Sequence, residues 1–174
     1  MKRFRPKAIM GGVLMLAVLL PLTLSKWPNR GVMPDVADHP APATLRRPIH
    51  VRHLWKESIS DEEYRFWADR TPFQMLSTLR FAESGGYGLG SKCENFVQEE
   101  DLAGLVQLLD SIEPAAHAVL LISSYAPQGA STVGHEAAYL LEGYRVGVYP
   151  PSLGSYNFTP NYAELKARYG KSGR

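Results

Sequence analysis

The sequence predicts a mainly α-helical protein, with an N-terminal transmembrane or signal helix, a proline-rich linker and a small all-α domain of about five short helices. Residues 8–24 are uncharged and follow a basic leader, whereas prolines recur over 28–50 without any hydrophobic period. Beyond residue 54, helix caps alternate with helix breakers, and only 144–149 has a plausible strand pattern. We therefore divide the chain into 1–27 (membrane anchor or signal peptide), 28–53 (linker) and 54–174 (helical extracytoplasmic domain).

Composition excludes several classes of protein. Hydrophobic residues make up 45% of the 174 residues and charged residues 21%, which is typical of a folded chain. Four of the 19 basic residues precede residue 8, which leaves 15 basic residues against 17 acidic ones in the remainder. Such a nearly neutral domain lacks the basic surface of a nucleic-acid binder. The lone Cys93 excludes an intramolecular disulfide, and we expect its thiol to be buried.

The apolar segment 8–24 is interpreted as an uncleaved membrane anchor. Its 17 residues would span about 25 Å as a helix, close to the ~30 Å hydrocarbon core of a bilayer. The basic leader places the N-terminus in the cytoplasm, by the positive-inside rule. The predicted location is therefore the inner membrane, single-pass, with a periplasmic C-terminal domain. The alternative is secretion after cleavage near Ser25.

The helices are predicted from their caps and from the proline and glycine residues that end them. Ser60 and Glu63 form a capping box, and Thr71-Pro72 supplies an N-cap followed by proline. Further helices are expected after Glu99–Asp101, from Pro114 through Tyr125, from Ser131 or Thr132 to Pro150, and from Thr159-Pro160 to Gly170. Gly85-Gly86 ends the second helix, and the glycine-rich stretch 85–92 is predicted to be a mobile loop.

The segment 99–126 resembles a HEAT-type helical hairpin. The resemblance rests on Leu108-Leu109-Asp110-Ser111-Ile112-Glu113-Pro114, in which a leucine-rich helix ends at an acid–proline turn. His117 stands where that pattern usually has arginine. The resemblance implies a helical surface that binds protein, although stacked repeats need about three copies and only one is found.

The stretch Glu83-Ser84-Gly85 is similar to the catalytic Glu-Ser pair of lytic transglycosylases. That resemblance implies a peptidoglycan-cleaving enzyme in which Glu83 acts as the general acid. The family's downstream motifs are missing apart from a trace in Gly88-Leu89-Gly90. We therefore keep Glu83 as an alternative reading and otherwise predict no catalytic residue.

The histidines form no recognisable metal motif. His135-Glu136 lacks a second histidine four residues on, where Tyr139 stands. His50, His53, His117 and His135 would share a metal only if the tertiary fold happened to bring them together. The sequence therefore predicts no metal site and no cofactor.

Aromatic residues gather near the C-terminus and are the predicted binding residues: Tyr144, Tyr149, Tyr156, Phe158 and Tyr162. With no catalytic motif beyond Glu83, the expected function is protein–protein interaction by a membrane-anchored, non-catalytic domain, with a protein partner of unknown identity. A small accessory subunit of a membrane complex, packed through 8–24, is a further alternative.

Overall fold

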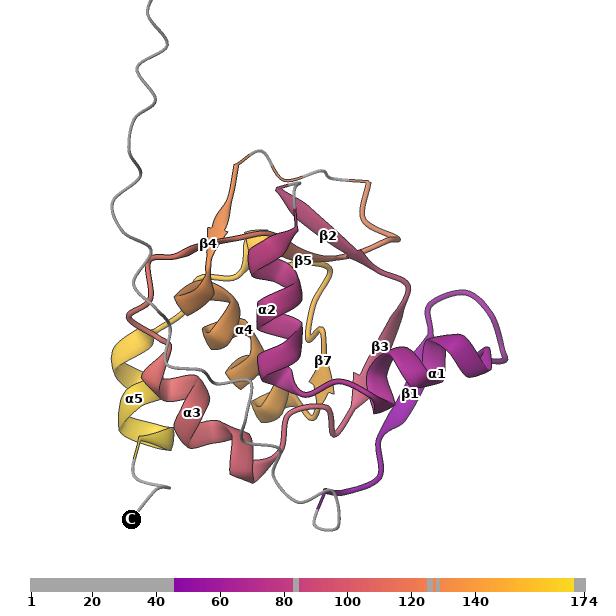
Figure 1. The fold of residues 1–174 in the computed structure, drawn as a ribbon, viewed down its shortest axis with the longest axis horizontal. Helices are drawn as coiled ribbons and strands as arrows, with labels where there is room; N and C mark the ends of the chain where they lie inside the picture. Colours follow the sequence, from indigo (N-terminus) through magenta and orange to yellow (C-terminus); the bar gives the residue numbers. More distant parts are fainter. Residues whose placement is uncertain (1–45, 83–84, 125–126, 128, 171–174) are drawn as a thin grey trace, which may run out of the picture. The chain divides into compact units, whose positions relative to one another are not determined.

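The computed structural model describes residues 46–82, 85–124, 127 and 129–170. These residues form five α-helices, seven short strands and two 3₁₀ turns (Figure 1). In chain order they are β1 (His50–His53), α1 (Asp61–Ala68), α2 (Pro72–Phe81), β2 (Gly86–Leu89), β3 (Ser91–Glu94), η2 (Glu99–Asp101), α3 (Leu102–Gln107), β4 (Pro114–Ala115), β5 (His117–Leu120), β6 (Ser131–Thr132), α4 (Val133–Val146), β7 (Val148–Tyr149), η3 (Ser155–Asn157) and α5 (Tyr162–Tyr169).

The prediction of a mainly α, all-α domain is wrong. Helix accounts for 43% of the described residues and strand for 19%, so the domain is mixed α/β. Its strands form three small sheets, with the orders β1-β3-β7, β2-β5 and β4-β6. The segment expected to be a Pro-rich linker ends in β1, which pairs antiparallel with β3 from His50 opposite Glu94 to His53 opposite Ser91.

The second helix of the HEAT-like hairpin does not exist. After α3, Pro114 begins β4, and β5 pairs in parallel with β2, from Gly86 opposite His117 to Leu89 opposite Leu120. Ala118 and Leu120 are fully buried, and a continuous apolar run of this kind belongs equally to a buried parallel strand and to a buried helix. The glycine-rich stretch predicted as a mobile loop supplies β2 and β3.

Three of the helix starts that were predicted from caps are confirmed, and a fourth is displaced. Ser60 and Thr71 form complete capping boxes with Glu63 and Gln74. Thr132 caps α4 through the amide of His135, and α4 ends at Gly147, whose φ of 83° needs glycine, rather than at the prolines beyond it. Where Thr159-Pro160 was expected to start the last helix, Asn161 is the cap.

The core lies around α4, against which α2, α3 and α5 pack (Figure 1). At one end, Trp67, Phe96 and Tyr149 form an aromatic cluster in which Phe96 and Tyr149 stack at 5.6 Å. Cys93 lies in the core as expected. Tyr149 also contacts Tyr139, so this cluster packs against α4.

The predicted membrane location is contradicted. In the part of the chain that the structure describes, no helix is long and apolar enough to cross a membrane. The single-pass inner-membrane assignment is therefore not supported. Residues 8–24 and Ser25, on which that assignment and its secreted alternative rested, lie outside the described residues.

Replacing Gly134 with alanine should destabilise the fold, although alanine is ordinarily the better helix former. A Cβ atom at Gly134 would lie 2.6 Å from the carbonyl oxygen of Leu109 and 2.7 Å from that of Ser111. We expect Gly134→Ala to lower the free energy of unfolding by about 1–3 kcal/mol in urea denaturation. Gly90→Ala, whose Cβ would make only ordinary contacts, is the control and should change it by less than about 0.5 kcal/mol. Equal stability of the two variants would contradict this packing.

The stability of the domain should fall as the pH rises above 9. Burial, and secondarily the charge of Glu94, raises the pKa of the Cys93 thiol from 9.0 to about 12. The unfolded thiol therefore loses its proton between pH 9 and 12 while the folded one keeps it, which favours unfolding by up to about 1.4 kcal/mol per pH unit. In urea denaturation across this range, the free energy of unfolding should fall less steeply with pH for Cys93→Ala than for the natural chain. Parallel curves would show that Cys93 does not contribute.

Candidate functional site

Two histidines, a glutamate and a serine meet where β5 crosses the start of α4. His117 comes from β5, His135 and Glu136 from the first turns of α4, and Ser155 from η3, which packs against both. We call these four residues the histidine–glutamate cluster. The imidazole rings of His117 and His135 lie edge to face, with their centroids 5.9 Å apart.

The carboxylate of Glu136 is the buried centre of the cluster, with no exposed surface. Its Oε1 accepts a 2.6 Å hydrogen bond from the Ser155 hydroxyl, and its Oε2 accepts one of 3.3 Å from the backbone amide of Ala118. The His117 Nδ1 atom lies 3.5 Å from Oε1. The N-terminus of α4 adds a favourable dipole, because Glu136 lies within its first turns.

Ser155 determines which protons the two imidazoles carry. Its hydroxyl has one proton, which it donates to Glu136, so its Oγ accepts from the His117 Nδ1 at 3.0 Å. Its carbonyl oxygen lies 2.9 Å from the His135 Nε2, which must therefore be the donor. Each neutral imidazole thus donates to Ser155 through one ring nitrogen and keeps a lone pair on the other. The nitrogen with the lone pair is Nε2 in His117 and Nδ1 in His135.

This arrangement favours proton or metal chemistry at the histidines over nucleophilic chemistry at the serine. His117 and His135 are partly exposed, whereas Ser155 is fully buried. A buried hydroxyl cannot reach a substrate, so Ser155 positions the other groups and does not attack.

The charge of Glu136 also acts on neighbouring tyrosines. Burial first, and Glu136 to a smaller extent, raises the pKa of Tyr139 to about 12 and raises that of Tyr149 well above its usual value. The pKa of Tyr162 rises for the same two reasons. These phenols stay protonated near neutral pH. The Tyr139 hydroxyl bonds to Ser152, whereas the buried Tyr149 hydroxyl has no hydrogen-bond partner among the described residues.

The predicted aromatic binding residues are not gathered in one groove. The Tyr156 ring lies 6.4 Å from that of His117, and the Phe158 ring lies 5.9 Å from that of His135, so both border the cluster. Tyr149 is buried in the core and Tyr162 is half-buried. Tyr144 packs on Tyr169 and lines a separate cavity of about 380 Å³.

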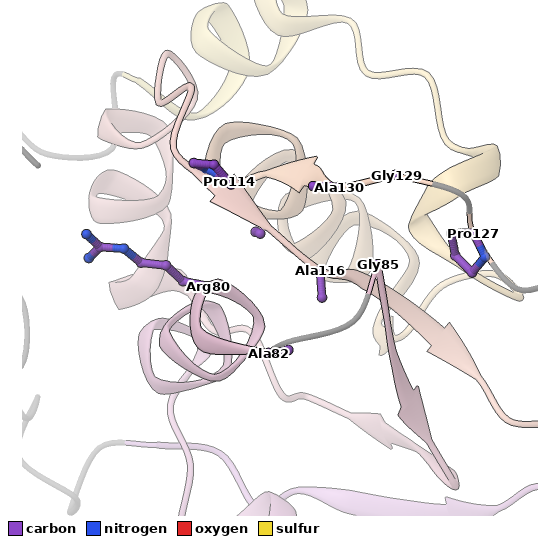
Figure 2. A pocket seen from close by; sticks show the side chains of 9 residues that line it. Arg80, Ala82, Gly85, Pro114, Ala116, Pro127, Gly129 and Ala130 are labelled. Atoms are coloured by element: carbon purple, nitrogen blue, oxygen red, sulfur yellow. The ribbon is translucent and has the colours of Figure 1, made fainter. Parts of the chain in front are cut away.

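A second cavity, of about 340 Å³, lies between the end of α2, strand β4 and the segment around Gly129. Figure 2 shows that its lining side chains are short, apart from Arg80 on one side and Pro127 on the other. Arg80 forms an ion pair of 2.9 Å with Glu113. The alternative catalytic residue, Glu83, lies outside the described residues, so the structure does not test it.

Sequence reasoning missed the cluster because its members are far apart in the chain. His117 and His135 were considered for a shared metal only through a chance of tertiary folding. Glu136 was considered only in the incomplete motif His135-Glu136, and Ser155 was not considered. No spacing rule links a strand histidine to a helix glutamate 19 positions later and a serine a further 19 beyond. No family model, curated protein or solved structure matches this chain, so the geometry of the site carries its interpretation.

Removing the Ser155 hydroxyl should destabilise the folded state. Ser155→Ala leaves Glu136 and His117 without their shared partner, and a buried polar group without its hydrogen bond costs about 1–3 kcal/mol. Ser152→Ala is the matched control, because that residue is exposed and its hydroxyl serves only Tyr139 and Gly154. Urea denaturation should show a clearly larger loss of unfolding free energy for Ser155→Ala than for Ser152→Ala. The opposite order would show that the hydrogen bonds of Ser155 do not stabilise the fold.

Proposed function

We propose that this domain binds another protein through an apolar rim beside the histidine–glutamate cluster. The rim consists of Leu121, Ile122 and Leu153. Their exposed fractions are 59%, 48% and 47%, and exposed aliphatic side chains on adjoining segments are typical of an interaction surface. This exposure is the observation that carries the proposal.

The segments that carry the rim are adjacent, although they are about 30 positions apart in the chain. The Leu120 amide donates a 2.8 Å hydrogen bond to the Leu153 carbonyl, so the turn after β5 and the segment before η3 lie side by side. The Leu121 amide is held in turn by the Leu89 carbonyl at 2.9 Å. Fixed backbone on both sides means that binding would require little ordering of the chain.

Polar groups border this apolar surface. The Tyr156 hydroxyl lies 2.7 Å from the Ser123 hydroxyl, just beyond the rim in both segments. Protein interfaces favour an apolar surface, such as this rim, with a tyrosine at its edge. The expected partner therefore presents apolar side chains to the rim and hydrogen-bonding groups to the tyrosine.

Polar substitution of the rim should abolish binding without unfolding the domain. The natural chain should capture its partner from an extract of the cells that produce it. We expect the double variant Leu121→Ser/Leu153→Ser not to capture this partner, with a loss of affinity of roughly tenfold or more. Ile112→Ser makes the same kind of change at a side chain that is 88% exposed in a different loop, and it should retain the partner.

Thermal unfolding of all three proteins should confirm that each is folded. The proposal is wrong if the rim variant captures the same partner as the natural chain. It is also wrong if the substitution alters only self-association in sedimentation, because the rim would then join two copies of this chain.

A further inference from the structure

We propose that His117, His135 and Glu136 bind a divalent transition-metal ion of the zinc class. One donor atom from each of the three residues lies within 4.8 Å of the others. This site goes beyond the proposed interaction with a protein partner and does not depend on it.

The donor set suits such an ion. Two imidazole nitrogens and one carboxylate oxygen are borderline ligands, which favour Zn²⁺ and its neighbours over the oxygen-seeking Mg²⁺ and Ca²⁺. Bonds of about 2.1 Å in a tetrahedral centre place two ligand atoms about 3.4 Å apart. The three donor atoms lie up to 4.8 Å apart, so the two partly exposed imidazole rings would turn toward Glu136 when an ion binds.

Ser155 supplies the outer hydrogen bonds that metal-binding histidines need. A ligating imidazole usually donates its other N–H to an oxygen atom, which fixes its orientation and tautomer. Here the His135 Nε2 donates to the Ser155 carbonyl, and the His117 Nδ1 donates to the Ser155 hydroxyl. The same hydroxyl donates to Glu136, so a single buried residue contacts all three side chains.

The charge of the site also calls for a cation. Glu136 is completely buried, and among the described residues its ion pair is with His117, which is charged only when protonated. With neutral imidazoles the carboxylate has hydrogen bonds but no opposite charge, which is a costly state for a buried acid. A divalent ion would provide that charge.

The pair of His53 and Glu63 provides an internal comparison. The His53 Nε2 lies 3.0 Å from Glu63 Oε1, so this pair also joins an imidazole and a carboxylate. Within the part of the chain that the structure describes, no third histidine, cysteine or carboxylate lies close enough to share an ion with this pair. The pair therefore tests whether a histidine next to an acid is enough.

Titration of the purified full chain with Zn²⁺, followed by calorimetry, tests the proposal. We expect one ion per chain, a rise in the unfolding temperature with Zn²⁺, and no displacement by excess Mg²⁺. His117→Ala and His135→Ala should each weaken binding roughly tenfold or more, since outer hydrogen bonds alone contribute 10- to 100-fold. His53→Ala should bind Zn²⁺ as the natural chain does.

Glu136→Gln keeps the shape of the buried side chain and should weaken binding similarly. If it fails to fold, the two histidine variants decide, because their rings are partly exposed. Co²⁺ offers a second readout, as a visible absorption band typical of nitrogen and oxygen ligands that His117→Ala removes. The proposal is overturned if the natural chain binds no Zn²⁺, if the histidine variants bind it equally well, or if His53→Ala weakens binding as much as they do.

Discussion

The carboxylate of Glu136 has no contact with solvent, and every element around it is arranged to satisfy it. The first turns of α4 direct it under β5, where the Ala118 amide and His117 meet it, and η3 brings the Ser155 hydroxyl to its other oxygen. A buried acid left without these partners would be destabilising by several kcal/mol. The position of η3, and of the segment that leads into it, therefore depends on this carboxylate.

The same network divides the site into a fixed and an accessible half. Glu136 and Ser155 are buried, whereas His117 and His135 are partly exposed and each contacts Ser155 through one ring nitrogen. The apolar rim begins close to the cluster, because Leu153 lies two residues before η3. A metal ion bound by the two imidazoles would stiffen the segment that carries Leu153 and Tyr156, which links the two proposals physically while leaving each separately testable.

The sequence predicted the local features of the fold and not those that depend on distant pairing. The capping boxes at Ser60 and Thr71 and the cap at Thr132 need only neighbouring residues, and all three are present. The strand β5 was expected to be a helix, because its run of buried apolar residues shows no period of two and gains its strand geometry only by pairing with β2. The histidine–glutamate cluster was not predicted for the same reason, because only the tertiary fold brings His117 close to Glu136.

The most direct measurement is the protonation of the two imidazoles, read from their ¹⁵N chemical shifts by NMR in the metal-free protein. The account predicts that His117 carries its proton on Nδ1 and His135 on Nε2 at a pH at which both rings are neutral. It also predicts that the Ser155→Ala substitution mixes the tautomers of His117. A His117 ring protonated on Nε2 in the natural chain would contradict the hydrogen-bond network on which the site is built.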